Sequence, residues 1–138
     1  MYIIIPIIVL FSTQLIKFTI ESFKNKKVML KRLFNGSGGM PSSHSSFITS
    51  ITTLIFLTEG GHSPIFGLAL IFSLIVLYDA INVRFQSGLH GKHINKLYSD
   101  YYKQEIKLKE ILGHNSFEII VGTLYGILIT SFIYFSFL

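Results

Sequence analysis

Apolar runs dominate the chain and divide it into four long segments. Residues 2–20, 45–58, 63–81 and 117–138 are mostly apolar, and polar connections separate them. A helix that crosses a membrane needs about 20 mostly apolar residues. The first, third and fourth segments come near that length, and the second reaches it if its helix begins close to Pro41. The pattern predicts an all-α, polytopic membrane bundle of about four transmembrane helices.

The composition supports a membrane protein and excludes several kinds of site. The 138 residues correspond to one domain, residues 1–138, and half of them are hydrophobic while 14% are charged. The mean hydropathy is +0.56, which is too apolar for an ordinary soluble domain of this size. The chain contains no Cys. It therefore has no disulfide framework, no thiolate metal site and no cysteine nucleophile.

The positive charges predict the orientation of the spans. All twelve Lys and Arg residues fall around the first connection, from Lys17 to Arg32, or within the third, from Arg84 to Lys109. The second connection has none. With four spans, the first and third connections share one face, and the positive-inside rule places that face in the cytoplasm. This placement accounts for the net charge of +5 without a nucleic-acid partner.

The third connection, residues 82–116, is polar but has a helical pattern. The apolar residues that recur at helical spacing among lysines are Ile94, Leu97, Tyr98, Tyr101 and Tyr102. This pattern predicts a basic amphipathic interfacial helix on the anionic membrane face. A solvated surface helix explains it equally well.

The stretch GGMPSSHS, residues 38–45, precedes the second apolar segment. Pro41 suits the first turn of a helix, and Ser42 and Ser43 lie at the same entrance. A helix N-terminus presents free N–H donors and favours phosphate, and His44 in the first turn can exchange a proton with such a ligand. On this stretch alone, a simple helix cap is the preferred interpretation.

A second histidine precedes the last apolar segment in LGHNSFEIIVG. His114 and Glu118 are four residues apart and share one face of a helix. The carboxylate can accept the Nδ1–H of the histidine and leave Nε2 basic, as in a nucleophile or general base. Asn115 and Glu118 also form a capping-box pattern. The two interpretations are compatible.

Three further polar residues lie near the ends of the first and third segments. Arg84 is suited either to a two-bond grip on phosphate or to anchoring at the interface. Asp79 needs a partner near the membrane, either Arg84 or a lysine, and so positions a phosphate ligand. Lys17 either reaches the interface or points into the bundle and binds phosphate. The predicted topology places these residues, His44 and His114 at the same membrane face.

The three motifs GGMPSSHS, VLYDAINVR and LGHNSFEIIVG resemble, in this order, the phosphatidic acid phosphatase type 2 and vanadium haloperoxidase superfamily. They are most similar to its small divergent branch in bacteria and plants. The resemblance implies that His44 is the general acid and His114 the nucleophile, followed by its acid, Glu118. It also implies that Lys17 and Arg84 bind the phosphate, together with the backbone of Pro41-Ser42-Ser43-His44.

The chain departs from the superfamily pattern at several positions. Ser43 replaces a glycine, and Glu118 replaces an aspartate. The early arginine–proline pair is missing, and Lys31 or Arg32 substitutes for its arginine.

The spacing between the arginine and the nucleophile also differs. Twenty-nine residues separate Arg84 from His114, whereas the superfamily has a short gap. His90 stands at the short spacing, but Ile94 replaces the acid that should follow it, so His114 is preferred. His90 and His93 are interpreted as interfacial or solvent-facing.

These observations predict a phosphatase of the bacterial plasma membrane that hydrolyses a lipid phosphate monoester, or a pyrophosphate, at the cytoplasmic leaflet. A phosphohistidine intermediate needs neither a metal nor an organic cofactor. The alternatives are a non-catalytic lipid-phosphate or anion binder, a transporter subunit, and a vanadate-dependent haloperoxidase. Gly122-x-x-x-Gly126 predicts close helix packing and a homodimer. The glycine of the superfamily motif explains Gly122 equally well.

Overall fold

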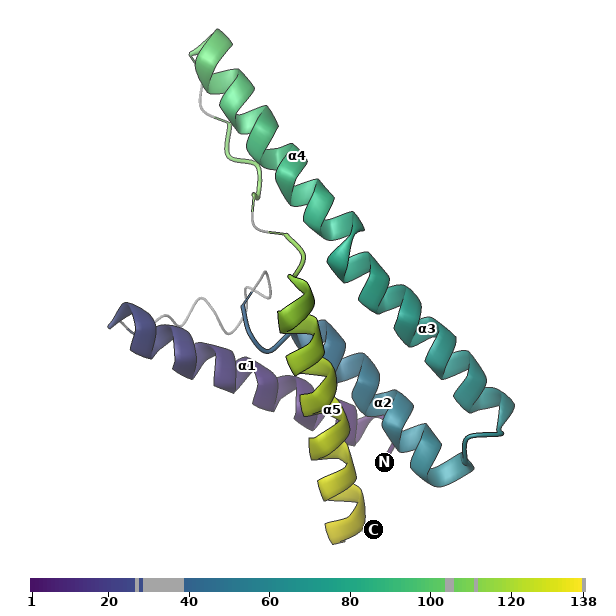
Figure 1. The fold of residues 1–138 in the computed structure, drawn as a ribbon. Coiled ribbons are helices and arrows are strands. Elements are labelled where there is room, and N and C mark those ends of the chain that lie inside the picture. Colours follow the sequence, from purple (N-terminus) through teal and green to yellow (C-terminus); the bar gives the residue numbers. More distant parts are fainter. Residues whose placement is uncertain (27, 29–38, 104–105, 111, 138) are drawn as a thin grey trace.

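The computed structural model describes residues 1–26, 28, 39–103, 106–110 and 112–137 (Figure 1). Within these residues, four helices pack together, and a fifth extends one of them away from the bundle. In chain order the elements are α1 (Ile4–Asn25), α2 (Ser43–Glu59), α3 (Pro64–Ile81), α4 (Val83–Leu97), the π-helical turn η2 (Tyr98–Tyr102) and α5 (Ser116–Phe137).

Among the residues that the structure describes, three helices are long and apolar enough to cross a membrane. They are α1, α5 and the continuous helix Pro64–Tyr102 that begins with α3. The expectation of about four such spans is met only in part, because α2 has 17 residues. Its helix begins at Ser43, two residues after Pro41, because the Ser42 side chain caps it; the proline therefore lies outside the first turn that the sequence predicts for it.

Helix α2 lies at the centre and packs against α1, α3 and α5. A pair of hydroxyl groups links α2 to each of these neighbours. The oxygen–oxygen distances are 2.9 Å for Thr13–Ser46, 2.6 Å for Thr52–Ser73 and 2.6 Å for Ser50–Thr130. Such bonds contribute about 0.6–2 kcal/mol each between membrane helices. The Ser- and Thr-rich composition of this segment therefore serves helix packing.

Two glycines let α5 approach α2 closely. A Cβ atom on Gly122 would lie 2.6 Å from the carbonyl oxygen of Ser42, and one on Gly126 would lie 2.5 Å from that of Ser46. The close packing expected of Gly122-x-x-x-Gly126 therefore occurs within the chain. Because Gly122 and Gly126 are buried against α2, they are not available for contact with a second chain. The homodimer stays a prediction that this motif no longer supports.

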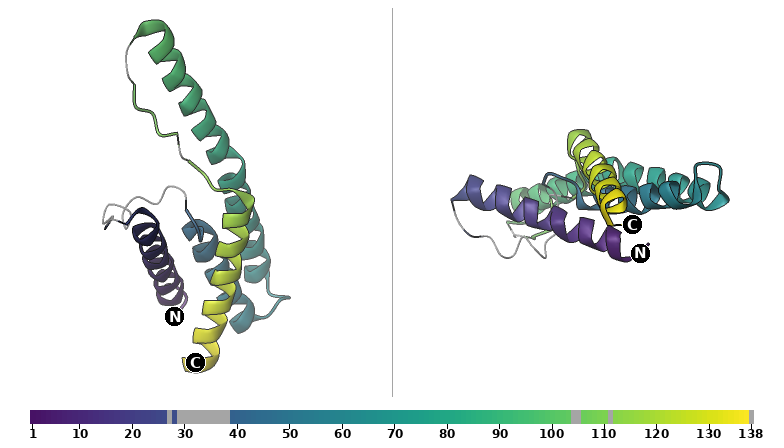
Figure 2. Two further views of the ribbon diagram at one scale, coloured as in Figure 1. Left: turned by 60° about the vertical axis from the view of Figure 1, so that its left-hand side comes forward. Right: turned by 90° about the horizontal axis from the view of Figure 1, so that it is seen from below.

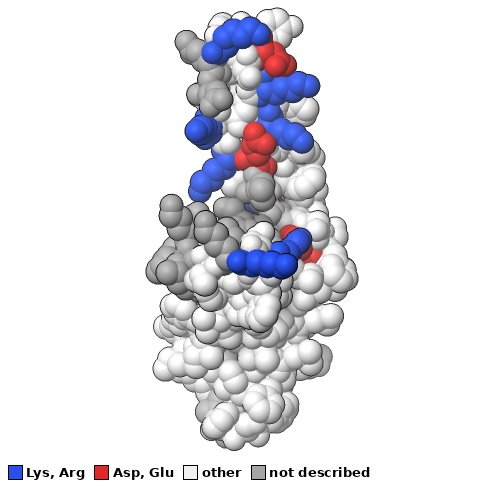
Figure 3. All heavy atoms as spheres, turned by 90° about the vertical axis from the view of Figure 1, so that its left-hand side faces the viewer, with Lys and Arg blue, Asp and Glu red and all other residues white. Residues whose placement is uncertain are grey.

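Helix α4 continues the line of α3 and carries the basic part of the chain away from the bundle (Figures 1 and 2). The sequence predicts a helix in this connection, either on the membrane face or solvated. The helix is present, only Asn82 separates it from α3, and it points away from the bundle. Figure 3 shows Lys and Arg side chains on this extension, while the lower part of the same face carries none.

The returning chain stabilises this extension. We call α4, η2 and residues 106–110 the arm. The side-chain amide of Asn95 makes two hydrogen bonds to the backbone of Leu108 in the returning segment. It donates to the Leu108 carbonyl oxygen and accepts from the Leu108 N–H, both at 3.0 Å. Gly88 and Gly91 are buried where that segment crosses α4, and each leaves no room for a Cβ against its backbone. The arm carries the chain back to His114.

Candidate active site

The first turn of α2 forms one side of the site. The Ser42 hydroxyl caps the helix by accepting from the Ser45 N–H at 3.3 Å, and the Ser42 N–H donates to the carbonyl oxygen of Glu118 at 3.1 Å. His44 follows in the first turn, as the sequence predicts. The hydroxyl of Ser42 is thus engaged in the cap, and its role as a phosphate ligand stays a prediction.

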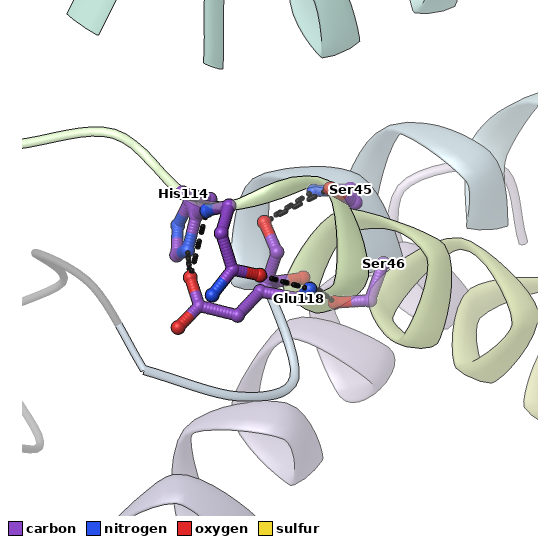
Figure 4. Close-up of polar contacts among 6 residues, drawn as sticks. Ser45, Ser46, His114 and Glu118 are labelled. Atoms are coloured by element: carbon purple, nitrogen blue, oxygen red, sulfur yellow. Dashed lines mark hydrogen bonds and ion pairs between the residues drawn. The ribbon is translucent and has the colours of Figure 1, made fainter. Parts of the chain in front are cut away.

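The start of α5 holds the second histidine. His114 is 4% exposed, and its Nδ1 lies 2.9 Å from Oε2 of Glu118 (Figure 4). The same carboxylate accepts from the Asn115 N–H at 3.3 Å, and Asn115 Oδ1 accepts from the Glu118 N–H at 2.8 Å. Glu118 therefore closes the capping box and orients the histidine at once. With Nδ1–H donating to the carboxylate, the lone pair of neutral His114 is on Nε2.

Backbone contacts fix the position of this histidine further. The His114 N–H donates to the carbonyl oxygen of Ala80 at 3.1 Å, which ties the start of α5 to the end of α3. Gly113 has φ +78°, and a Cβ there would lie 2.6 Å from the backbone nitrogen of Phe85. The sequence analysis assigns no role to Gly113. Its position directly before His114 nevertheless indicates a turn whose backbone conformation favours glycine.

Arg84 joins the end of α3 to the start of α2. Its Nε donates to Oδ2 of Asp79 at 2.6 Å, and its Nη1 lies 3.1 Å from Nε2 of His44. The partner expected for Asp79 is therefore Arg84. Because a guanidinium only donates, Nε2 of His44 accepts in this arrangement, and the proton of the neutral ring is on Nδ1.

The two histidines face each other within a positively charged region. Their ring centroids are 6.2 Å apart, and the rings are inclined at 61°. Lys17 of α1 is 4% exposed, so it points into the bundle. Burial lowers the pKa of His114 below the usual 6.5, the hydrogen bond that His114 donates to Glu118 raises it in part, and the charge of Lys17 lowers the pKa again. The lowered pKa favours the neutral form of His114 at pH 7.

Two buried polar atoms of the α2 entrance lack a hydrogen-bond partner in the described part of the chain. They are Oγ of Ser43 and Nδ1 of His44. Buried polar groups are nearly always satisfied by protein, water or a ligand. Together with Arg84 and the N-terminus of α2, these atoms form an electropositive cradle that suits an anion.

Other residues considered from the sequence lie elsewhere. His90 and His93 are exposed on α4, as expected. Among the residues that the structure describes, no group of three or more His, Asp or Glu side chains is arranged to hold a metal ion. Lys31 and Arg32, considered as substitutes for the missing arginine, lie outside the described residues.

Comparisons with known proteins agree with the motifs. Residues 1–129 match the divergent PAP2 family (DUF212). The chain is also 36% identical over 132 residues to "Uncharacterized membrane protein YuiD" of Bacillus subtilis (strain 168), an alignment that covers 85% of this chain and 83% of the relative. No solved structure shows significant similarity. On the family match and this relative, the chain belongs to the divergent PAP2 family and is a membrane protein.

Proposed function

We propose that this protein hydrolyses a lipid phosphate monoester through a phosphohistidine on His114. One observation carries the proposal: Glu118 holds Nδ1 of a buried histidine at 2.9 Å, and the opposed ring of His44 is 6.2 Å away. A carboxylate-oriented imidazole beside a second imidazole is an arrangement for nucleophilic attack and proton transfer. Membership of a PAP2-related family agrees with phosphoryl chemistry.

In the first step, the Nε2 lone pair of His114 attacks phosphorus in line with the leaving oxygen. The N–P bond forms as the bond between phosphorus and the lipid oxygen breaks. His44 in its imidazolium form donates its proton to that oxygen, and the lipid alcohol leaves. Glu118 stabilises the positive charge that develops on the His114 ring.

In the second step, His44 is a neutral base. It accepts a proton from water, and the resulting hydroxide attacks phosphorus. The N–P bond breaks, inorganic phosphate leaves, and His114 regains its lone pair. Atoms and charge balance over the cycle, because the proton that His44 gives to the lipid oxygen returns from water.

Cationic and hydroxyl groups stabilise the phosphoryl oxygens in this scheme. Arg84 and Lys17 supply positive charge, and Ser43 with the N–H groups of the first turn of α2 supplies donors. Arg84 donates to Nε2 of His44 in the structure. Phosphate oxygens attract the guanidinium more strongly than a neutral imidazole does, so substrate binding draws Arg84 away and frees Nε2 for its proton.

The position of the site favours an amphiphilic substrate. His44 lies in the first turn of α2, His114 lies two residues before α5, and Arg84 lies in the first turn of α4, directly after the apolar α3. We assign this end of the bundle to the cytoplasmic face of a bacterial plasma membrane, by the positive-inside rule. A phosphate monoester on a membrane lipid reaches such a site without leaving its leaflet.

Phosphate release from lipid phosphates in detergent tests the proposal. Wild-type protein is compared with His114→Asn and His44→Ala on phosphatidic acid, phosphatidylglycerol phosphate and a polyprenyl phosphate. We expect one class to be hydrolysed and both variants to lose that activity. Saturable binding of all three lipids without turnover, unchanged by His114→Asn, would instead identify a non-catalytic lipid-phosphate binder or a transporter subunit.

A further inference from the structure

An apolar groove of about 390 Å³ lies between α2 and α3, on the same pair of helices that carries His44 and Asp79. Every residue that lines the groove is apolar. Beside it, the Thr52–Ser73 hydroxyl pair joins the two helices. The principal lining residues are Ile48, Ile51 and Ile55 of α2, with Leu68, Ala69 and Phe72 of α3.

The α2 wall of the groove continues directly to the active site. Ile48, Ile51 and Ile55 follow His44 by four, seven and eleven residues. With 3.6 residues per turn, these four positions lie on one face of the helix. The residues of this wall therefore form a stripe along α2, and His44 lies at the N-terminal end of that stripe.

The α3 wall ends in the same way. Asp79 follows Phe72 by seven residues and Leu68 by eleven, so it stands on the face that lines the groove. Asp79 binds Arg84 at 2.6 Å, and Arg84 reaches Nε2 of His44 at 3.1 Å. At one end of the groove, the two apolar walls therefore lead to Asp79 and His44, which Arg84 links by hydrogen bonds.

The length of the groove suits one lipid chain. From Phe47 to Ile55 the α2 wall covers eight residue steps, about 12 Å at roughly 1.5 Å per step. One leaflet contributes half of a hydrocarbon core of about 30 Å. A chain whose phosphate occupies the active site can thus run along the groove for most of the depth of its own leaflet.

We propose that this groove binds the hydrocarbon chain of the phosphate ester whose phosphoryl group enters the active site. The inference rests on the proposed function, and it identifies the substrate as a lipid with a chain long enough to follow α2 and α3. A free phosphate or a short alkyl phosphate contacts only the polar head of the site. The groove therefore makes the enzyme selective for chain length.

A substitution that fills the groove tests this proposal with two substrates that share one headgroup. Ala69→Trp places a bulky ring between the helices, whereas Leu74→Trp, on the opposite face of α3 and 59% exposed, is the matched control. We expect kcat/KM for dodecyl phosphate to fall at least 10-fold in Ala69→Trp, while butyl phosphate hydrolysis stays within twofold of wild type. Leu74→Trp should change neither. Equal losses for both substrates, or none for dodecyl phosphate, would overturn the proposal.

A binding measurement keeps the groove testable if no alkyl phosphate is hydrolysed. The chain has no Trp, so Phe72→Trp and Leu74→Trp each introduce a single indole. We expect dodecyl phosphate brominated along its chain to quench the fluorescence of Phe72→Trp saturably, and unbrominated dodecyl phosphate, but not butyl phosphate, to reverse this. Quenching that is equal in the two variants and does not saturate would show that the groove holds only bulk lipid or detergent. Saturable quenching without turnover would retain the groove and reject the catalytic proposal.

Discussion

His44 and Arg84 are forty residues apart in the chain, yet Nε2 of one lies 3.1 Å from Nη1 of the other. The contact joins the first turn of α2 to the first turn of α4. Asp79 holds the other side of the guanidinium at 2.6 Å. Arg84 therefore lies between its carboxylate partner, Asp79, and the imidazole of His44, which is expected to transfer the proton.

Replacement of Asp79 tests the importance of this position. Asp79→Asn keeps the size of the side chain but removes the charge that orients Arg84. We expect inhibition by vanadate, which mimics the trigonal phosphoryl group, to weaken about 10-fold, since one charge-assisted hydrogen bond is worth about 1.5–3 kcal/mol. Arg84→Ala should weaken it further. A vanadate Ki unchanged in both variants would contradict a phosphate-binding role for the arginine.

Glu118 offers a substitution that separates its two structural roles. Glu118→Gln preserves the capping box, because Gln also accepts the Asn115 N–H, but it removes the carboxylate behind His114. We expect kcat to fall by about 10²–10⁴-fold, as when the carboxylate behind a catalytic histidine is neutralised. Thermal unfolding in detergent should be little changed. A loss of activity that merely follows a loss of folded protein would assign Glu118 to the cap alone.

The pH dependence of activity follows from the pKa of His114. Burial lowers this pKa below 6.5, and attack requires the neutral ring. As pH falls, the nucleophile is therefore lost only below pH 6.5, and the acidic limb of kcat/KM should lie there. Glu118 raises the pKa of His114, so Glu118→Gln should move this limb to still lower pH. A limb that moved to higher pH in that variant would contradict the assignment of the limb to His114.

The close approach of α5 to α2 predicts a stability effect with a matched control. Gly126→Ala places a methyl group against the backbone of Ser46, and overpacking of this kind costs about 1–3 kcal/mol. Gly67→Ala in α3 meets no atom within 4 Å and should leave the unfolding temperature unchanged or slightly higher. The two variants are compared by thermal unfolding in the same detergent. Equal unfolding temperatures would show that α2 and α5 do not pack this closely.

Local chemistry was predictable from the sequence because it depends on short spacings. The capping box of Asn115 and Glu118, and the pairing of Glu118 with His114, follow from separations of three and four residues. The pairing of Asp79 with Arg84 follows from the scarcity of partners at the end of an apolar helix. The helices of the three long apolar segments follow from their length and composition.

Features that depend on neighbouring helices were not predictable in the same way. The role of α2 as the central helix rests on hydroxyl groups such as Ser46 and Ser50, which pair with α1 and α5. In the sequence, these serines only lower the hydropathy of the segment. The spacing of Gly122 and Gly126 is compatible with helix packing between two chains or within one chain, and in the structure they pack against α2 of the same chain. The path of the returning segment depends on Asn95, which accepts from the Leu108 N–H thirteen residues away.

Capture of the covalent intermediate is the measurement that tests the central claim most directly. Wild type, His44→Ala and His114→Asn are mixed with a short-chain phosphatidic acid, quenched in alkali within the first turnover, and mapped by mass spectrometry for phosphohistidine. We predict phosphate on His114 in wild type, slower appearance of it in His44→Ala because that variant lacks the acid for the leaving oxygen, and none in His114→Asn. Turnover of the lipid by His114→Asn, or phosphate on another residue, would contradict the assignment of His114 as the nucleophile.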